Sequence, residues 1–318
     1  MQQIRILEHQ SSKVFTLAFI ALCIGLISIA SAAILIKFCE HEISPYTTVF
    51  SRFWLASLIL GVWQGLSAIY RQREVQESCQ SSPYSGAVIV KLLLVGISLA
   101  IDLILWAWSI TQTSIANATL LVNLAPIFTC LGGWLIWKRQ LDRQFLVGII
   151  IAIFGLVTLG FNDMQITPDK FKGDIAALLG AISFGVYLLL VEQLQTQLNS
   201  TKIMLWSSII SMLFTFPIVL IDGGSIFPNS WQGWLTIIAF AVICQLLGQG
   251  SLVYSLKHLS ADFVALFLLL DPVLASVGAW VFFSEKLSLL NLIGFAIVLV
   301  GISLGLSSPS ALDKTQTV

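Results

Sequence analysis

The chain has 318 residues, of which 57% are hydrophobic and only 10% are charged, and its formal net charge at pH 7 is zero. Soluble proteins carry about 25% charged residues. This composition therefore excludes a water-soluble fold of this length and predicts a protein with several membrane-spanning segments. The balanced charge gives no indication of a nucleic acid partner.

Ten apolar runs are long enough to cross a bilayer, which takes about 20 helical residues. They lie near residues 14–36, 46–66, 87–109, 114–137, 144–161, 174–194, 202–221, 233–256, 261–283 and 289–307. Because the bilayer core holds no water, every backbone N–H and C=O must bond within the chain. Each run is therefore predicted to be a helix and the fold to be all-α. The first run is predicted to be retained, since it is too long for a signal-peptide core and lacks an A-x-A cleavage site.

The distribution of Lys and Arg predicts the orientation of the chain. With a cytoplasmic N-terminus, eleven of these residues lie on the cytoplasmic side and four on the other. The tails at 1–13 and 308–318 are then both cytoplasmic. The expected location is the plasma membrane.

One long stretch of the sequence occurs twice. Residues 113–159 align without a gap on residues 259–305, at an offset of 146. The matched positions include residue types that shared hydrophobicity does not explain: Pro126 with Pro272, Gly132 with Gly278, Trp134 with Trp280, Gly148 with Gly294 and Gly155 with Gly301. Two five-helix repeats are therefore predicted, at 14–161 and 174–307.

An odd number of crossings in each repeat turns the second repeat upside down in the membrane. Inverted repeats of this kind build transporters in which one unit rocks against the other around a central binding site. The internal repeat thus predicts a transport function as well as a fold.

Pro126 and Pro272 occupy equivalent positions in the middle of two predicted helices. Proline has no N–H to donate, so the carbonyls of Val122 and Leu268 lose their helical partners. Two interpretations are open. The prolines either shape helix packing through a static kink, or they bend the helices so that the freed carbonyls line the binding site.

Three charged residues lie within the predicted crossings, where a charge costs at least about 2.5–3.5 kcal/mol. Arg52 and Asp102 lie at similar depths, so they either pair with each other or bind an ionic group of the solute. Asp271, next to Pro272, is the best-placed group for exchanging a proton in a proton-coupled carrier. The alternative is a neutral acid bonded to backbone. The equivalent residue in the first repeat is Ala125, so this charge is present in one repeat only.

Four side-chain amides also lie within apolar runs: Asn117, Asn123, Gln245 and Gln249. They are candidate substrate-binding residues, although hydrogen bonding between helices is the commoner role of such groups in membranes. Gln245 and Gln249 are four residues apart and are predicted to share one helix face. Trp106 and Trp108 are predicted to anchor the chain at the membrane interface, with the mouth of the binding site as the alternative.

The sequence contains no Walker loop, HExxH or GxGxxG motif, which argues against an ATP-driven pump or a membrane protease. Gly301–Gly305 fits the G-x-S-x-G pattern of hydrolases, but it lies inside an apolar run and is interpreted as helix packing. Three histidines and five scattered cysteines predict no metal site, and no cofactor is expected.

These features resemble the EamA-type members of the drug/metabolite transporter superfamily. Residues Tyr254–Leu304 look like the signature of the family's last three helices, with an acidic residue before Pro272, Glu285 after it, and glycines seven apart. Pro45 followed by Arg52 matches the family's pattern in its second helix. The resemblance implies ten helices, cytoplasmic termini, and efflux or exchange of small metabolites.

The sequence departs from the family at two positions. Arg139 stands where the family often has Glu, and Asp271 replaces the commoner Glu. The first departure argues against a symmetric use of this loop acid by the two repeats, because Glu285 keeps it in the second.

The combined prediction is a secondary transporter, not an enzyme. It exports or exchanges small metabolites, either amino-acid-like or amphiphilic, by alternating access. Its predicted partners are the solute, the lipid bilayer and protons as the candidate coupling ion, with a homodimer as a further candidate. The alternative is a non-transporting membrane protein, such as a lipid-modifying enzyme or a sensor subunit. An enzyme should cluster His, Asp or Ser near one interface, and the sequence shows no such cluster.

Overall fold

The computed structural model describes residues 2–39, 43–72, 84–113, 115–160, 170–284 and 287–308. Regular secondary structure in this part of the chain is entirely helical, and ten segments are long and apolar enough to cross a membrane. The predicted all-α fold with ten crossings is thereby confirmed. Glu285 and residues 309–318 of the C-terminal tail lie outside the described residues.

Seven of these ten crossings are single helices, namely α1 (Gln2–Cys39), α2 (Pro45–Gln72), α3 (Gly86–Gln112), α6 (Arg143–Gly160), α7 (Phe171–Leu194), α8 (Ser200–Asp222) and α13 (Leu289–Leu306). The other three are built from shorter pieces. The fourth crossing consists of α4 (Ile115–Val122) and α5 (Ala125–Trp137), the eighth of α9 (Trp231–Ala239), η2 (Phe240–Gln249) and α10 (Gly250–Ser255), and the ninth of α11 (Ala261–Leu268) and α12 (Asp271–Phe283).

Successive crossings run in opposite directions, so their connections alternate between two faces of the molecule. We call one of them the α1–α2 face. It carries the connections α1–α2, α3–α4, α6–α7, α8–α9 and α12–α13. The opposite face, which we call the α2–α3 face, carries the connections α2–α3, α5–α6, α7–α8 and α10–α11.

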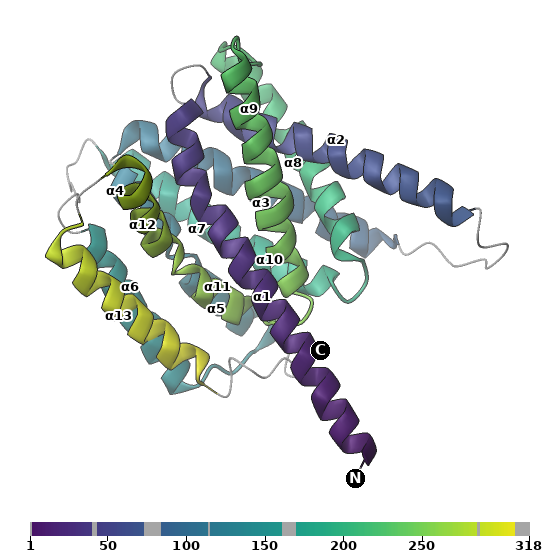
Figure 1. Ribbon diagram of the computed structural model, residues 1–318, viewed down its shortest axis with the longest axis vertical. Coiled ribbons are helices and arrows are strands. Elements are labelled where there is room, and N and C mark those ends of the chain that lie inside the picture. Colours follow the sequence, from purple (N-terminus) through teal and green to yellow (C-terminus); the bar gives the residue numbers. More distant parts are fainter. Residues whose placement is uncertain are drawn as a thin grey trace.

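The two repeats pack against each other in a reciprocal pattern. The first helix of the first repeat, α1, packs on η2, α10 and α12 of the second. The first helix of the second repeat, α7, packs on α3, α4 and α5 of the first. Helix α2 pairs with α8 and α6 pairs with α13, and Figure 1 shows α6 and α13 side by side at one edge of the molecule. Most of these contacts have an equivalent, as expected of inverted repeats. The packing of α4 on α7 has no comparable counterpart between α11 and α1.

Glycines bring α6 and α13 into close contact. A Cβ atom on Gly148 would lie 2.5 Å from the backbone nitrogen of Gly305, and one on Gly155 would lie 2.6 Å from the backbone nitrogen of Val298. Small residues let helix backbones approach closely within a membrane. The carbonyl of Gly301 lies in the same contact, 2.7 Å from the Cβ position of Gly148. The G-x-S-x-G pattern is therefore a packing motif here, as predicted.

Large apolar side chains cover the outside of the molecule. Trp63, Leu135 and Phe154 are each exposed over more than 60% of their surface. In a helical protein with ten apolar crossings, such side chains contact lipid rather than water. The chain is thus a multi-pass membrane protein.

Candidate functional site

The fourth and ninth crossings are broken at equivalent places. A turn at residues 123–124 separates α4 from α5, and a turn at residues 269–270 separates α11 from α12. Pro126 and Pro272 lie in the first turn of α5 and α12. Proline suits this position because the first N–H groups of a helix have no intrahelical partner. The predicted bends are therefore short turns that interrupt the α-helical hydrogen bonding, with Leu124 and Leu270 donating to carbonyls three residues back. Each of these breaks is followed by a new helix N-terminus.

Both breaks border a cavity of about 260 Å³. From the first repeat it is lined by residues 29–32 of α1, 45–52 of α2 and 99–110 of α3, all in the half of the molecule toward the α1–α2 face. Side chains of α7, η2, α11 and α12 from the second repeat complete the walls. Ligand sites for small molecules enclose about 300–1,000 Å³, so the cavity suits a small solute. It lies between the two repeats, as the inverted architecture predicts.

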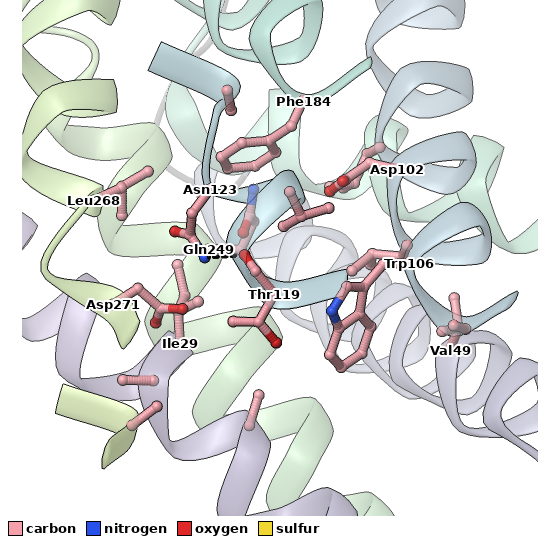
Figure 2. Close-up of a pocket in the computed structure, with 18 of the residues that line it drawn as sticks. Ile29, Val49, Asp102, Trp106, Thr119, Asn123, Phe184, Gln249, Leu268 and Asp271 are labelled. Carbon is pink, nitrogen blue, oxygen red and sulfur yellow. Dashed lines mark hydrogen bonds between the residues drawn. The ribbon is translucent and has the colours of Figure 1, made fainter. Parts of the chain in front are cut away.

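Two carboxylates reach the cavity from different helices. Figure 2 shows Asp271 and Asp102 on opposite sides of the cavity, with Asn123 and Gln249 between them. Asp271 is the first residue of α12, and its Oδ1 atom has no hydrogen-bond partner among the described residues. Asp102 lies in the second half of α3, where its Oδ1 is 3.4 Å from the Cβ position of Gly180 on α7.

A guanidinium also lines the cavity, and the second repeat holds it in place. The Nε of Arg52 donates a hydrogen bond of 2.5 Å to Oε1 of Gln245, and the Nε2 of Gln245 donates one of 3.5 Å to Oγ of Ser208. The guanidinium lies over the ring of Phe240, 5.5 Å from its centroid. Arg52 and Asp102 are both described and form no ion pair with each other. The structure thus shows Arg52 in the cavity wall without an ion pair to Asp102. Binding of an ionic group of the solute stays a prediction.

Asn123 and Gln249, two of the four predicted binding amides, line the cavity. Asn123 occupies the turn between α4 and α5, and its Nδ2 donates a hydrogen bond of 2.8 Å to the carbonyl of Thr119. The Oδ1 of Asn123 has no corresponding hydrogen bond among the described residues. Gln249 is buried in the cavity wall, where its side chain lies beside the hydroxyl of Tyr187 on α7.

Asn117 and Gln245 do not line the cavity. The Nδ2 of Asn117 donates to Oγ1 of Thr113 and to Oδ1 of Asp174, each at 3.4 Å. These bonds connect the α3–α4 corner to α7 near the α1–α2 face. Gln245 is fully buried and bonds Arg52 instead. The geometry does not support substrate contact for either residue.

Gln245 and Gln249 lie in an unusually wound part of the eighth crossing. Residues Phe240–Gln249 form a π-helix, in which each turn holds more residues than the 3.6 of an α-helix. Residues four apart still lie close to each other around the axis of such a helix. Both glutamines are buried, Gln245 against Arg52 and Gln249 in the cavity wall.

Two aromatic side chains, Trp106 of α3 and Phe184 of α7, line the cavity (Figure 2). For Trp106 the sequence favoured the membrane interface, with the mouth of the binding site as the alternative, and Phe184 was missed. A large aromatic residue in an apolar run gives no indication of which face it occupies. A weak indication existed for Trp106, which lies four residues from Asp102 and therefore on the same face of α3.

Comparisons with known proteins point to one family. The model of the EamA-like transporter family matches residues 16–161 and 171–306. The chain belongs to the EamA-like transporter family. It is 22% identical to an uncharacterised transporter of Archaeoglobus fulgidus over 86% of this chain and 92% of that protein.

Two further relatives of this EamA-like chain have names that state an activity. It is 22% identical to the pseudopaline exporter CntI of Pseudomonas aeruginosa, over 84% of this chain and 87% of that protein. It is 24% identical to a probable amino-acid metabolite efflux pump of Salmonella typhimurium, over 58% of this chain and 65% of that protein. A solved crystal structure superposes with a TM-score of 0.75 at 16% identity, covering 90% of this chain and 98% of that one, which shows a shared fold.

Membership of the EamA-like family makes the chain a transporter and not an enzyme.

Arg139, which stands where the family often has Glu, forms two buried ion pairs. Its Nη1 donates to Oδ2 of Asp262 at 2.9 Å and its Nη2 donates to Oε2 of Glu192 at 2.5 Å. This cluster lies toward the α2–α3 face, away from the cavity mouth. Burial alone lowers the pKa of Arg139, but the two carboxylates outweigh it and raise the pKa above its ordinary value.

Proposed function

We propose that this EamA-like transporter is a secondary transporter that exports or exchanges small amphipathic solutes carrying an amino group, by alternating access coupled to protons. The observation that supports it best is the cavity between the repeats, which is lined by Arg52, Asp102 and Asp271 and bordered by the two broken crossings. Intramembrane charges that face a cavity mark solute and ion pathways.

Charge at the cavity wall favours a solute with an amino group. Two carboxylates and one guanidinium line the cavity, so a solute amino group compensates the excess negative charge. We assign Asp102 to this amino group. An anionic group at the other end of the solute can be bound by Arg52 and by the N-terminus of α5, where a helix carries partial positive charge. Ala125 places no acid at that N-terminus, whereas Asp271 occupies the equivalent position of α12.

Apolar walls account for the amphipathic character of the proposed solute. Trp106 and Phe184 present aromatic surface to the cavity, and Ile29 and Leu268 present aliphatic surface (Figure 2). Removing apolar surface from water contributes about 25 cal/mol per Å². A solute with a short apolar segment is therefore favoured over a sugar-like one, which would leave hydroxyl groups without partners.

We assign proton exchange to Asp271, with Asn123 and Gln249 as solute-binding amides. A carboxylate that binds a proton becomes neutral, and the free-energy cost of placing its charge within the membrane is then removed. Loading and release of the solute can thereby be linked to protonation. The names of two relatives, an exporter and an efflux pump, support the export direction.

The proposed setting is the plasma membrane with both termini in the cytoplasm, which the excess of Lys and Arg supports. In this orientation the α2–α3 face is cytoplasmic and the cavity opens to the outside. A homodimer stays a prediction from the sequence.

Transport in proteoliposomes tests the proposal. Purified protein is reconstituted into liposomes, and a panel of radiolabelled amino acids, amines and organic acids is tested. The flux of each compound is followed with and without a pH gradient. We expect flux of solutes with an amino group and accumulation driven by the gradient. Asp271→Asn should abolish the gradient dependence while exchange between labelled and unlabelled solute continues, because the cavity is otherwise intact.

Asp222→Asn is the matched control, since Asp222 is an exposed carboxylate at the end of α8 outside the cavity. It should leave both activities unchanged. Unaltered proton dependence in Asp271→Asn would refute the coupling role. Flux of organic acids alone would refute the proposed solute class.

A further inference from the structure

The buried cluster of Arg139, Glu192 and Asp262 joins the two repeats. Arg139 follows α5 in the first repeat, whereas Glu192 lies on α7 and Asp262 on α11 in the second. The side chains of all three are at most 6% exposed. The ion pairs therefore connect three separate crossings, on the side of the cavity toward the α2–α3 face.

The local backbone directs Arg139 into this cluster. Lys138 ends α5 in the left-handed conformation, with φ of 53°, and the chain turns back so that the N–H of Arg139 donates to the carbonyl of Gly133 at 3.3 Å. A Cβ atom on Gly133 would lie 3.1 Å from Cδ of Arg139, so glycine leaves room for the side chain. The guanidinium is also 5.7 Å from the centroid of the Trp137 ring.

The cluster lies between the cavity and the α2–α3 face. On α7, Phe184 lines the cavity, Leu188 is fully buried one turn further on, and Glu192 follows after another turn. Residues four apart share a helix face, so these three side chains form a column from the cavity to the cluster. On α11, Asp262 is three residues from Ala265 of the cavity wall.

Stability alone is a poor explanation for this cluster. One guanidinium faces two carboxylates, and the Nε of Arg139 has no hydrogen-bond partner among the described residues. A buried ion pair often contributes less than apolar packing of the same volume, because both charges lose their hydration. Such pairs are better suited to holding one arrangement of packed elements against another.

We propose that Arg139, Glu192 and Asp262 form a latch that closes the transport pathway at the α2–α3 face while the cavity is open toward the α1–α2 face. The proposal rests on alternating access. When the repeats rock, α5 separates from α7 and α11, and the three ion-pairing side chains become accessible to water. The latch is a conformational device distinct from the solute site, since none of its residues lines the cavity.

The latch belongs to one face only. The internal repeat places Glu285 at the position of Arg139 and Ala116 at that of Asp262, so the equivalent positions do not supply the same set of charges at the opposite face. A device at one face favours the state in which that face is closed. The latch thus biases the resting protein toward the arrangement seen here.

Thiol labelling from each side of the membrane tests the latch without any solute. The five native cysteines are replaced by serine or alanine, and one of two reporters is introduced: Leu188→Cys in the column below the cavity, or Ala275→Cys in the cavity wall. An impermeant maleimide is applied to right-side-out and inside-out vesicles. Arg143→Cys, on an exposed residue at the α2–α3 face, identifies the vesicle side.

The latch variant is Arg139→Gln/Glu192→Gln/Asp262→Asn, which removes every charge of the cluster and keeps the volume of the two acidic side chains. We expect Leu188→Cys to label on the order of tenfold faster from the α2–α3 face, a typical size for a coupled conformational shift. Ala275→Cys should label more slowly from the α1–α2 face. Arg143→Gln, which removes a charge at the same face outside the cluster, should change neither rate.

Arg139→Lys provides a milder variant that keeps the cation but loses the two-pronged geometry. It should shift both reporters in the same directions by a smaller factor. Unchanged labelling of Leu188→Cys in both variants would overturn the proposal. Faster labelling of both reporters together would also overturn it, since that result indicates loosened packing and not alternation. Because no flux is measured, failure of the transport assay leaves this test unaffected.

Discussion

Single residues at the cavity wall acquire their roles from neighbours that are distant in sequence. Arg52 is 193 positions from Gln245, yet their hydrogen bond fixes where the guanidinium lies. In the proposed function, the remaining N–H groups of Arg52 bind an anionic group of the solute. We propose that Gln245, which does not line the cavity, acts through Arg52.

Arg52→Lys should weaken solute binding. Lysine keeps the charge, but it cannot reproduce the fork of donors or the bond from Nε to Gln245. A hydrogen bond to a charged group contributes about 1.5–3 kcal/mol. We therefore expect the half-saturating solute concentration to rise by about tenfold or more, measured as initial exchange rates in proteoliposomes. Arg143→Lys is the control, and equal half-saturation in Arg52→Lys and the parent would contradict the role.

At the scale of secondary structure, the two broken helices set the site. Proline alone does not break a helix here, because Pro217 lies inside the continuous helix α8. At 123–124 and 269–270 the backbone turns instead, and the proline begins the next helix. The breaks bring helix N-termini to the middle of the membrane, which broken helices in other transporters use to bind ions and solutes.

Replacing these prolines tests whether the breaks serve transport. In Pro126→Ala and Pro272→Ala the restored N–H allows the fourth or ninth crossing to form a more continuous helix. We expect exchange rates to fall by about tenfold or more, as for loss of a few kcal/mol of preorganisation, with normal yield and a monodisperse elution profile. Pro217→Ala is a matched control and should keep its rate. Full activity in both break variants would show that the breaks only accommodate packing.

Close packing between the helices α6 and α13 contributes to the stability of the protein. A methyl group at Gly148 would meet the backbone of Gly305, which cannot move aside as a side chain can. Gly148→Ala should therefore destabilise the protein by about 1–3 kcal/mol through overpacking. Thermal unfolding in detergent measures this cost. Gly61→Ala is the control, since no atom lies within 4 Å of its Cβ position; an equal loss in both variants would contradict the packing argument.

For the whole molecule, the decisive property is that equivalent repeats are not identical. Asp271 has Ala125 as its counterpart, and Arg139 has Glu285. The third crossing is the continuous helix α3, whereas its counterpart, the eighth, contains the π-helix η2. In the proposed alternating access, inverted symmetry makes two opposite-facing states available, and we propose that these differences make their free energies unequal. One state can then be preferred at rest, with the solute and the proton shifting the balance.

The amino-acid sequence by itself determined the fold class, the number of crossings and the internal repeat, because each follows from local rules. A bilayer requires about 20 apolar residues for each helical crossing, and matched prolines and glycines reveal a duplication without any coordinates. Several site residues followed from the same reasoning, since a charge in a membrane is costly wherever it lies. Arg52, Asp102 and Asp271 were predicted on that basis, and all three line the cavity.

Only the tertiary structure decided which polar residues face the cavity and which join helices. Asn117 and Asn123 look alike in sequence, but one bonds Asp174 at the edge of α7 and the other lies in the wall of the cavity. The cluster of Arg139, Glu192 and Asp262 depends on contacts between three crossings. Arg139 is 53 positions from Glu192 and 123 positions from Asp262. Side-chain direction within an apolar helix depends on the neighbouring helices, and composition carries no record of them because lipid-facing and core-facing residues are equally apolar.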